Sequence, residues 1–367
     1  MWSLEDIQGA CARILTVAPS RWQTSLIHTI DIDVKKLPLV YPVRTALLVL
    51  AAVAALTTLD DQNTQITVAL GITFAGLIDA PDALSTRFMV LWRAGLAMVV
   101  CATLGMWVAN SPVLLVAVAA VLAAILGYAG IIGPRMAVAG VLSLVLFTVF
   151  AGTPERGWSL VDNTAALAAG IALYIVVAFA TTPLLARFVR ARSTFPQFHP
   201  SHFTQNLSQF PGWQNPYTRH GIRLAAAVAI GEVVALTWHF PHSYWIPMTV
   251  VWISKPDLDG TVSKTVYRVI GTIIGVGACL VLFGVLGVPY WVGVLTVALG
   301  AGIATAFLWV NYSIAVTGIT IEVLSLFQLD HQSIDTTAPW RIIATMLAGI
   351  IVIVASYAWR TKERAPA

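Results

Sequence analysis

The feature that most constrains the fold is a stretch from residue 94 to residue 134 that contains no Asp, Glu, Lys or Arg. The hydrocarbon core of a bilayer is about 30 Å thick, and a helix needs roughly 20 apolar residues to cross it. In lipid, only helices and closed barrels satisfy their backbone hydrogen bonds. Because the stretch shows no period-two alternation, it predicts membrane-spanning helices rather than barrel strands.

The composition extends this conclusion to most of the chain. Of the 367 residues, 58% are hydrophobic and 10% are charged, whereas a soluble globular protein carries about 25% charged residues. We therefore predict an all-α polytopic membrane protein with about 12 transmembrane helices. The predicted spans are 43–59, 65–80, 88–109, 112–131, 136–152, 163–186, 221–238, 244–255, 265–286, 289–308, 310–329 and 339–359.

The two halves of the chain carry related residues at matching spacings. Each half has a Pro-Asp pair followed by a Thr and then an Arg at identical spacing, namely Pro81, Asp82, Thr86 and Arg93 in the first half and Pro256, Asp257, Thr261 and Arg268 in the second. Gly140 and Gly170 similarly match Gly318 and Gly349. Six spans per half give both copies one orientation, so we predict two parallel six-helix repeats related by an axis along the membrane normal.

These patterns divide the chain into five parts. Residues 1–42 form a cytoplasmic N-terminal segment, in which apolar residues at helical spacing over 4–18 predict an amphipathic helix on the membrane surface. A short soluble helix docked on the bundle is the alternative for 4–18. The membrane repeats cover 43–186 and 220–360, a polar cytoplasmic linker covers 187–219, and 361–367 form a cytoplasmic tail.

The placement of basic residues predicts the orientation. With the N-terminus in the cytoplasm and alternating spans, all Lys and Arg except Arg156 and Arg341 fall on the inner side, as the positive-inside rule requires. We predict a bacterial inner-membrane protein with both termini cytoplasmic. The net charge of +4 follows from this topology and does not predict nucleic-acid binding. The expected partners are the lipid bilayer and a small anion, and the sequence leaves open a homo-oligomer and a periplasmic efflux partner.

Four arginines near the predicted cytoplasmic ends of spans form two matching pairs, Arg44 with Arg223 and Arg93 with Arg268. A guanidinium group binds a carboxylate through two parallel hydrogen bonds. Gathered around the repeat axis, these side chains would form a cationic vestibule for anions. The alternative is that positive-inside anchoring alone explains all four.

The second span of each half is a further candidate site. Segment 244–255 is short and contains Pro247, and its partner 65–80 contains Gly71. Short or interrupted spans at matching positions of two repeats indicate a transport site, because they expose backbone groups to a ligand. The alternative is a tilted helix that ends at a proline turn.

Two acidic residues, Glu232 and Glu322, lie inside apolar spans. An ionisable group at membrane depth is costly and therefore indicates function, so we predict that one or both carry a proton during transport. Glu232 has the alternative of pairing with an arginine. Trp245 is a candidate for stacking on an aromatic substrate, but the ordinary interpretation places it in the aromatic belt at the outer interface.

The chain lacks the motifs of common enzymes. It contains no phosphate-binding loop, nucleophile elbow or two-histidine zinc helix. The three cysteines, Cys11, Cys101 and Cys279, are too far apart to suggest a metal site or a disulfide. We expect a non-enzyme without catalytic residues, cofactor or metal.

The stretch from Arg223 to Gly275 resembles the fusaric acid resistance (FUSC), or aromatic acid exporter, superfamily. The residues that carry the resemblance are Arg223, Pro241, Trp245, Pro256, Thr261, the run from Arg268 through Gly271 to Thr272, and Gly275. The resemblance extends over roughly 40–360, but the first half has Ala94-Gly95-Leu96 where the second has the Gly-Thr pair. Longer members carry a large cytoplasmic domain, and here only the linker 187–219 stands between the repeats.

The resemblance implies efflux of small aromatic carboxylic acids driven by the proton gradient. The similar plant malate channels imply that membrane-embedded arginines face an anion pathway, and the matching run places Thr272 with Arg268 there. We therefore predict a secondary transporter that exports small organic anions. The alternatives are an organic-anion channel of similar architecture and a non-transporting envelope scaffold.

Overall fold

The computed structural model describes residues 39–57, 61–81, 83–153, 160–185 and 215–358. Within these ranges the chain forms twelve α-helices, and it forms no strand there. The predicted all-α architecture is confirmed. The predicted surface helix over 4–18 and most of the linker 187–219 lie outside the described residues.

Each predicted span corresponds to one α-helix. The helices are α3 (Val40–Leu56), α4 (Gln62–Ile78), α5 (Leu84–Val108), α6 (Pro112–Tyr128), α7 (Pro134–Ala151), α8 (Leu160–Leu185), α10 (Pro216–Thr237), α11 (Trp245–Ile253), α12 (Leu258–Cys279), α13 (Tyr290–Phe307), α14 (Tyr312–Leu329) and α15 (Ile334–Ala358). A 3₁₀ turn, Ala129–Ile131, follows α6, and a π-helical segment, Leu280–Val285, extends α12.

Most of these helices have the dimensions of membrane spans. In the described ranges, nine are long and apolar enough to cross a bilayer. Helices α3 and α4 have 17 residues each and are therefore about 25 Å long, whereas α11 has only nine residues. Large apolar side chains such as Val113 and Trp107 point outward and are 83% and 64% exposed. The chain is a multi-pass membrane protein with an apolar surface for lipid.

Several helices begin earlier than hydropathy predicts, because capping residues extend them into polar sequence. Helix α10 begins at Pro216 rather than near residue 221, and the Asn215 side chain accepts a hydrogen bond from the Tyr217 amide at 2.9 Å. Helix α12 begins at Leu258 rather than near residue 265, and the Asp257 carboxylate accepts from the Gly260 amide at 2.6 Å.

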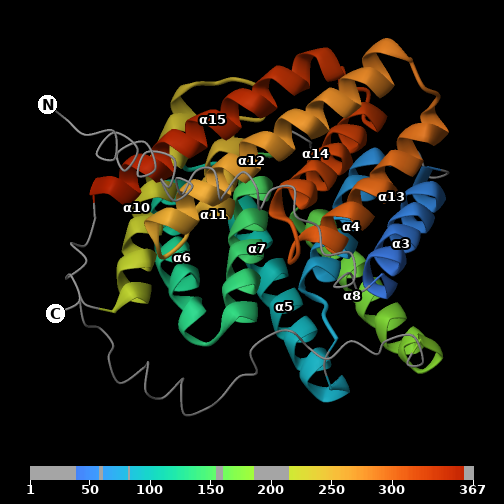
Figure 1. Ribbon diagram of the computed structural model, residues 1–367, viewed down its shortest axis with the longest axis horizontal. Coiled ribbons are helices and arrows are strands. Elements are labelled where there is room, and N and C mark those ends of the chain that lie inside the picture. Colours follow the sequence, from blue (N-terminus) through green and yellow to red (C-terminus); the bar gives the residue numbers. More distant parts are fainter. Residues whose placement is uncertain (1–38, 58–60, 82, 154–159, 186–214, 359–367) are drawn as a thin grey trace, which may run out of the picture.

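Figure 1 shows the helices of both halves packed into one bundle, and two helix pairs of the first half recur in the second. In the first half α5 packs on α7 and α4 packs on α8, and in the second half α12 packs on α14 and α11 packs on α15. The halves join through two matching contacts, α10 on α6 and α3 on α13, and α11 also packs on α7. This recurrence is consistent with the predicted six-helix repeats, whose boundaries stay a prediction.

Glycines allow the closest helix crossings. A Cβ atom added at Gly170 in α8 would lie 2.4 Å from the Val68 carbonyl oxygen in α4, and one added at Gly71 in α4 would lie 2.7 Å from the Leu167 carbonyl oxygen in α8. Small residues at such crossings let helix backbones approach in membranes. Gly71, a predicted site residue, therefore stands at the contact between α4 and α8.

Helices α3, α5, α7, α10, α12 and α14 all begin at one end of the bundle, which we name the basic end. In the described ranges, every Lys and Arg except Arg341 belongs to the first half of one of these helices or to the turn before α12. The opposite end carries the starts of α4, α6, α8, α11, α13 and α15 and is named the outer end. The predicted topology places the basic end in the cytoplasm.

Candidate functional site

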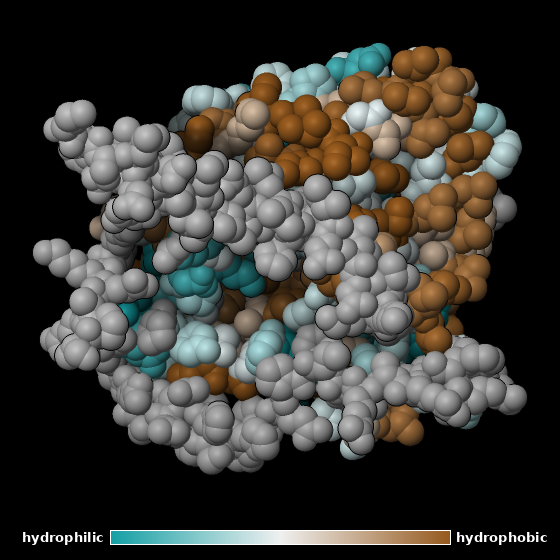
Figure 2. Space-filling view, viewed as in Figure 1, coloured by the Kyte–Doolittle hydropathy of each residue, from teal (hydrophilic) through white to brown (hydrophobic). Residues whose placement is uncertain are grey.

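A large cavity of about 1170 Å³ opens at the basic end between the two halves. Helices α5, α6 and α7 of the first half and α10, α11, α12 and α14 of the second half provide its walls. Figure 2 shows hydrophilic side chains within a recess of the molecular surface, in the region that α6, α7, α10 and α11 occupy in Figure 1. We name this space the basic cavity.

The charged groups on the walls of the basic cavity are all cationic. Among the described residues that line it, the Lys and Arg side chains are Arg93, Arg135, Lys255 and Lys264, and none is Asp or Glu. Aromatic side chains complete the walls, namely Tyr217, Trp252, Trp309 and Tyr312. The Lys264 ammonium lies 4.4 Å from the Tyr312 ring centroid. A cationic and aromatic lining suits an anion that carries a ring.

Arg268 lies deeper than the lining of the basic cavity. It comes ten residues after the start of α12, which places its Cα about 15 Å along the helix. The side chain is fully buried, its guanidinium carbon lies 5.7 Å from the Trp252 ring centroid, and its nitrogens make no hydrogen bond. Arg268 therefore presents a buried positive charge behind Trp252.

A second, smaller cavity of about 80 Å³ lies further toward the outer end, and we name it the central cavity. Its walls come mainly from α4, α7, α11 and α14, and Arg341 of α15 contributes a side chain. Trp252 belongs to the walls of both cavities. The two spaces are therefore neighbours, with this indole side chain at their common boundary.

The two predicted proton carriers occupy different environments. Glu322 lines the central cavity, is 2% exposed, and accepts a hydrogen bond from the Thr73 hydroxyl at 2.5 Å. This bond joins α14 of the second half to α4 of the first half. Glu232 is also buried, but it lines neither cavity and its Oε1 atom has no hydrogen-bond partner.

Aromatic side chains gather beside the central cavity toward the outer end. The His242 ring stacks against both Trp245 and Phe327 with centroid distances of 4.7 and 4.5 Å, and the Trp245 and Phe327 centroids are 5.9 Å apart. Trp245 is only 1% exposed, so the interpretation that it belongs to the aromatic belt is wrong. Trp245 is the first residue of α11, a nine-residue helix whose residues are all buried. Trp238 is 57% exposed, so its exposure agrees with a place in the aromatic belt.

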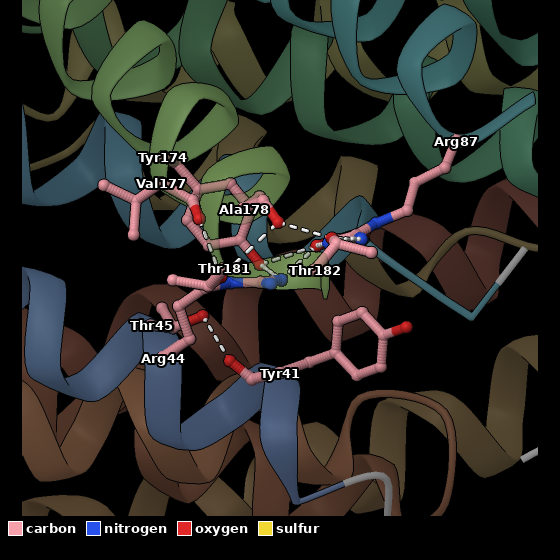
Figure 3. Close-up of polar contacts among 10 residues, drawn as sticks. Tyr41, Arg44, Thr45, Arg87, Tyr174, Val177, Ala178, Thr181 and Thr182 are labelled. Carbon is pink, nitrogen blue, oxygen red and sulfur yellow. Dashed lines mark hydrogen bonds and ion pairs between the residues drawn. The ribbon is translucent and has the colours of Figure 1, made fainter. Parts of the chain in front are cut away.

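At the basic end of the first half, one buried carboxylate holds two arginines (Figure 3). Asp79 accepts two hydrogen bonds from Arg87, both at 2.6 Å, and it also forms an ion pair with Arg44. Tyr174 donates to Asp79 at 3.0 Å and accepts from Arg44 at 2.8 Å. The remaining Arg87 nitrogen donates to Thr182 at 2.8 Å. Arg44 is therefore bound within a charged cluster and lines neither cavity.

The corresponding position of the second half has no carboxylate. Ser254 follows α11 as Asp79 follows α4, and the backbone angles agree, with φ and ψ of −65° and 131° at Ser254 and −68° and 133° at Asp79. Arg223, the match of Arg44, instead donates to the carbonyl oxygens of Lys255 at 2.7 Å and Pro256 at 2.6 Å. Thus this turn has no counterpart of Asp79, and the nearby Asp257 interacts with Arg223 only electrostatically while it caps α12.

The other predicted site residues lie away from both cavities. Pro247 packs against Gly231 where α11 crosses α10, with its Cα atom 3.1 Å from a Cβ added at that glycine. Thr272 is buried and its hydroxyl has no hydrogen-bond partner. Among the predicted residues, the structure brings only Arg93 to the basic cavity and only Trp245 and Glu322 to the central cavity. The described residues contain no cluster of His, Cys, Asp and Glu that could hold a metal.

Sequence reasoning missed several residues of the site. It placed Arg341 with the charges outside the membrane, but Arg341 lies within α15, is 1% exposed and lines the central cavity. The predicted span started at residue 339, whereas α15 starts at Ile334, so the helix carries Arg341 into the bundle. Asp79 was also missed, although its place two residues before the matched Pro81 aligns it with Ser254.

Comparison with known proteins identifies a family for the second half. Residues 226–355 match the family described as fusaric acid resistance protein-like, which confirms the resemblance predicted from the sequence. No solved structure matches the chain significantly.

Three curated relatives cover similar shares of the chain. An uncharacterized protein of Haemophilus influenzae is 32% identical over 167 residues, 43% of this chain and 21% of that protein. The inner membrane protein YccS of Escherichia coli is 28% identical over 160 residues, 43% of this chain and 21% of YccS. An uncharacterized protein of Synechocystis is 29% identical over 148 residues, 38% of this chain and 18% of that protein. Each match thus spans about a fifth of the relative's length.

Proposed function

We propose that this multi-pass membrane protein, which carries a fusaric acid resistance protein-like domain over residues 226–355, exports small aromatic carboxylic acids across a bacterial inner membrane. The observation that supports this most is the basic cavity, whose described lining combines four Lys and Arg side chains with four Tyr and Trp side chains and has no acid. Low-dielectric walls of one charge sign raise the local concentration of oppositely charged solutes.

The geometry supports a route in two steps. An aromatic acid enters the basic cavity from the cytoplasm, where cations attract its carboxylate and aromatic walls pack on its ring. It then passes Trp252 toward the central cavity, beside which the His242, Trp245 and Phe327 rings pack toward the outer end. The route narrows from about 1170 Å³ in the basic cavity to about 80 Å³ in the central cavity, and a small site deep between two repeats fits alternating access.

Efflux from proteoliposomes tests this function. The purified full chain, reconstituted into vesicles loaded with radiolabelled salicylate or fusaric acid, should release either acid faster than protein-free vesicles. We expect Arg93→Gln to lower the rate about fivefold at low ionic strength, because this cation attracts the anion into the cavity. The difference should shrink in high salt, since salt screens exposed charges.

Arg219→Gln is the matched control, because it removes the same charge at the same end of the bundle but from a residue outside the cavity lining. We expect it to retain most of the wild-type rate. If the two variants slow efflux equally, the basic cavity does not collect the substrate. If wild-type vesicles release no acid above the protein-free background, the transport proposal itself fails and the scaffold alternative stands.

Glu322 carries the proton in this proposal. It lines the central cavity and its bond to Thr73 crosses between the two halves, so a change in its protonation reaches both. In Glu322→Gln the amide oxygen keeps the bond from Thr73 but cannot titrate. We expect an imposed pH gradient to stop driving efflux in this variant, while downhill exchange of labelled for unlabelled salicylate persists.

Glu232→Gln provides the control for that experiment. Glu232 is equally buried but lies outside both cavities, so efflux driven by the pH gradient should be unchanged in the variant. Loss of the pH response in Glu232→Gln with retention in Glu322→Gln would reverse the assignment. Wild-type efflux that ignores the pH gradient would instead favour the channel.

A further inference from the structure

Arg341 is a buried cation whose charge nothing in the described structure neutralises. Its side chain is 1% exposed, and none of its three guanidinium nitrogens has a hydrogen-bond partner. Its guanidinium carbon lies 4.9 Å from the Trp245 ring centroid. A cation–π contact of this kind leaves the N–H donors around the edge of the guanidinium free for an anion.

The surroundings raise the cost of this charge. Arg268 is close enough to Arg341 for the two guanidinium groups to repel each other electrostatically, and Arg268 is also buried without a hydrogen bond. Burying a charge is strongly unfavourable unless a partner neutralises it and accepts its hydrogen bonds. An anion that binds both neighbouring buried cations would therefore be strongly stabilised.

The protein does not supply that anion from its own described side chains. Glu322 lines the same central cavity as Arg341, but its Oε1 atom accepts from Thr73, and Arg341 makes no bond to it. Asp79, the buried carboxylate of the first half, is occupied by Arg44 and Arg87. Arg341 thus faces the central cavity with its donors unused.

We propose that Arg341 is a binding residue for the carboxylate of the transported acid, in the central cavity beside Trp245. This inference rests on the proposed function, and it adds a second substrate-binding site beyond the basic cavity. The cavity volume of about 80 Å³ admits a carboxylate group, whereas a cavity that binds benzene measures about 150 Å³. The ring of the acid would therefore lie toward Trp252, at the boundary with the basic cavity.

Equilibrium dialysis of the purified full chain in detergent against radiolabelled salicylate tests the site without requiring transport. We expect Arg341→Met to weaken binding about tenfold or more, since a charge-assisted hydrogen bond to a buried carboxylate is lost. Arg341→Lys should restore part of the affinity, because it returns the charge but not the planar fork. Arg219→Gln, which removes a cation from α10 outside both cavity linings, should bind salicylate like wild type.

Thermal unfolding separates a binding role from a structural role. A ligand that binds the native state raises Tm, so saturating salicylate should raise the Tm of wild type and not that of Arg341→Met. Without salicylate, Arg341→Met should unfold at the wild-type Tm or above it, because the substitution removes an unneutralised buried charge. A Tm lower by more than loss of the Trp245 ring contact explains, measured without salicylate, would show that the protein itself neutralises Arg341 and would overturn the proposal.

Two further results would also contradict the proposal that Arg341 binds the substrate carboxylate. Equal binding of salicylate by Arg341→Met and wild type would place the carboxylate elsewhere, and equal competition by chloride would show a site for any small anion rather than a carboxylate site. The proposed function is judged separately by the efflux assay. A wild-type protein that binds salicylate through Arg341 but does not move it would leave this inference standing and remove the export function.

Discussion

We expect Ser254→Asp to reduce salicylate efflux about tenfold or more while leaving the protein folded. Ser254 lines the basic cavity and occupies in the second half the place that Asp79 occupies in the first. An aspartate there would lie next to the turn whose carbonyl oxygens bind Arg223. The new carboxylate would neutralise local cations and repel the substrate carboxylate, and unfavourable like-charge contacts cost several kcal/mol.

The measurement is the initial rate of efflux from proteoliposomes, with the elution volume and Tm of the variant as checks of folding. Ser254→Asn is the matched control, because asparagine has nearly the shape of aspartate without its charge. We expect Ser254→Asn to retain most of the wild-type rate. If both variants lose efflux to the same extent, side-chain volume rather than charge decides, and the electrostatic role of the basic cavity is wrong.

Asp79→Asn should destabilise the whole bundle. Asp79 is the carboxylate on which Arg44 and Arg87 converge, and the three side chains are 7% exposed or less. Removing one partner of a buried ion pair costs about 3–5 kcal/mol, because the other charge stays buried without compensation. Here two guanidinium groups would face a neutral amide. The hydrogen bonds and ion pairs that link α3, α5 and α8 to the turn after α4 would weaken together.

We expect the Tm of purified Asp79→Asn to fall by about 10 °C and the yield from membranes to fall with it. Ser254→Asn again serves as the control, since it places the same residue at the matching turn where no carboxylate is lost. The double variant Asp79→Asn with Arg87→Met should recover part of the lost stability, because one unpaired cation is removed. A Tm within a degree or two of wild type for Asp79→Asn alone would mean that the charged cluster does not hold the first half together.

The candidate site could be predicted only in part. Arg93 and Glu322 stand out in the sequence as ionisable residues within apolar segments, and both line cavities. The same criterion selected Arg44, whose charge Asp79 neutralises, and Glu232, which lies away from both cavities. A sequence pattern indicates that a charged residue lies near the membrane. It does not indicate which residue, distant in the sequence, forms an ion pair with it.

By itself, the sequence determined the number, order and approximate limits of the helices, because the length of an apolar run is a local property that the bilayer thickness fixes. Only the tertiary structure decided which faces of these helices point inward. Lipid chains and a protein core are both apolar, so helices such as α6 carry little pattern that separates the two. For this reason the burial of Trp245, the pairing of Asp79 with two arginines, and the place of Arg341 in the central cavity became visible only once the twelve helices were packed together.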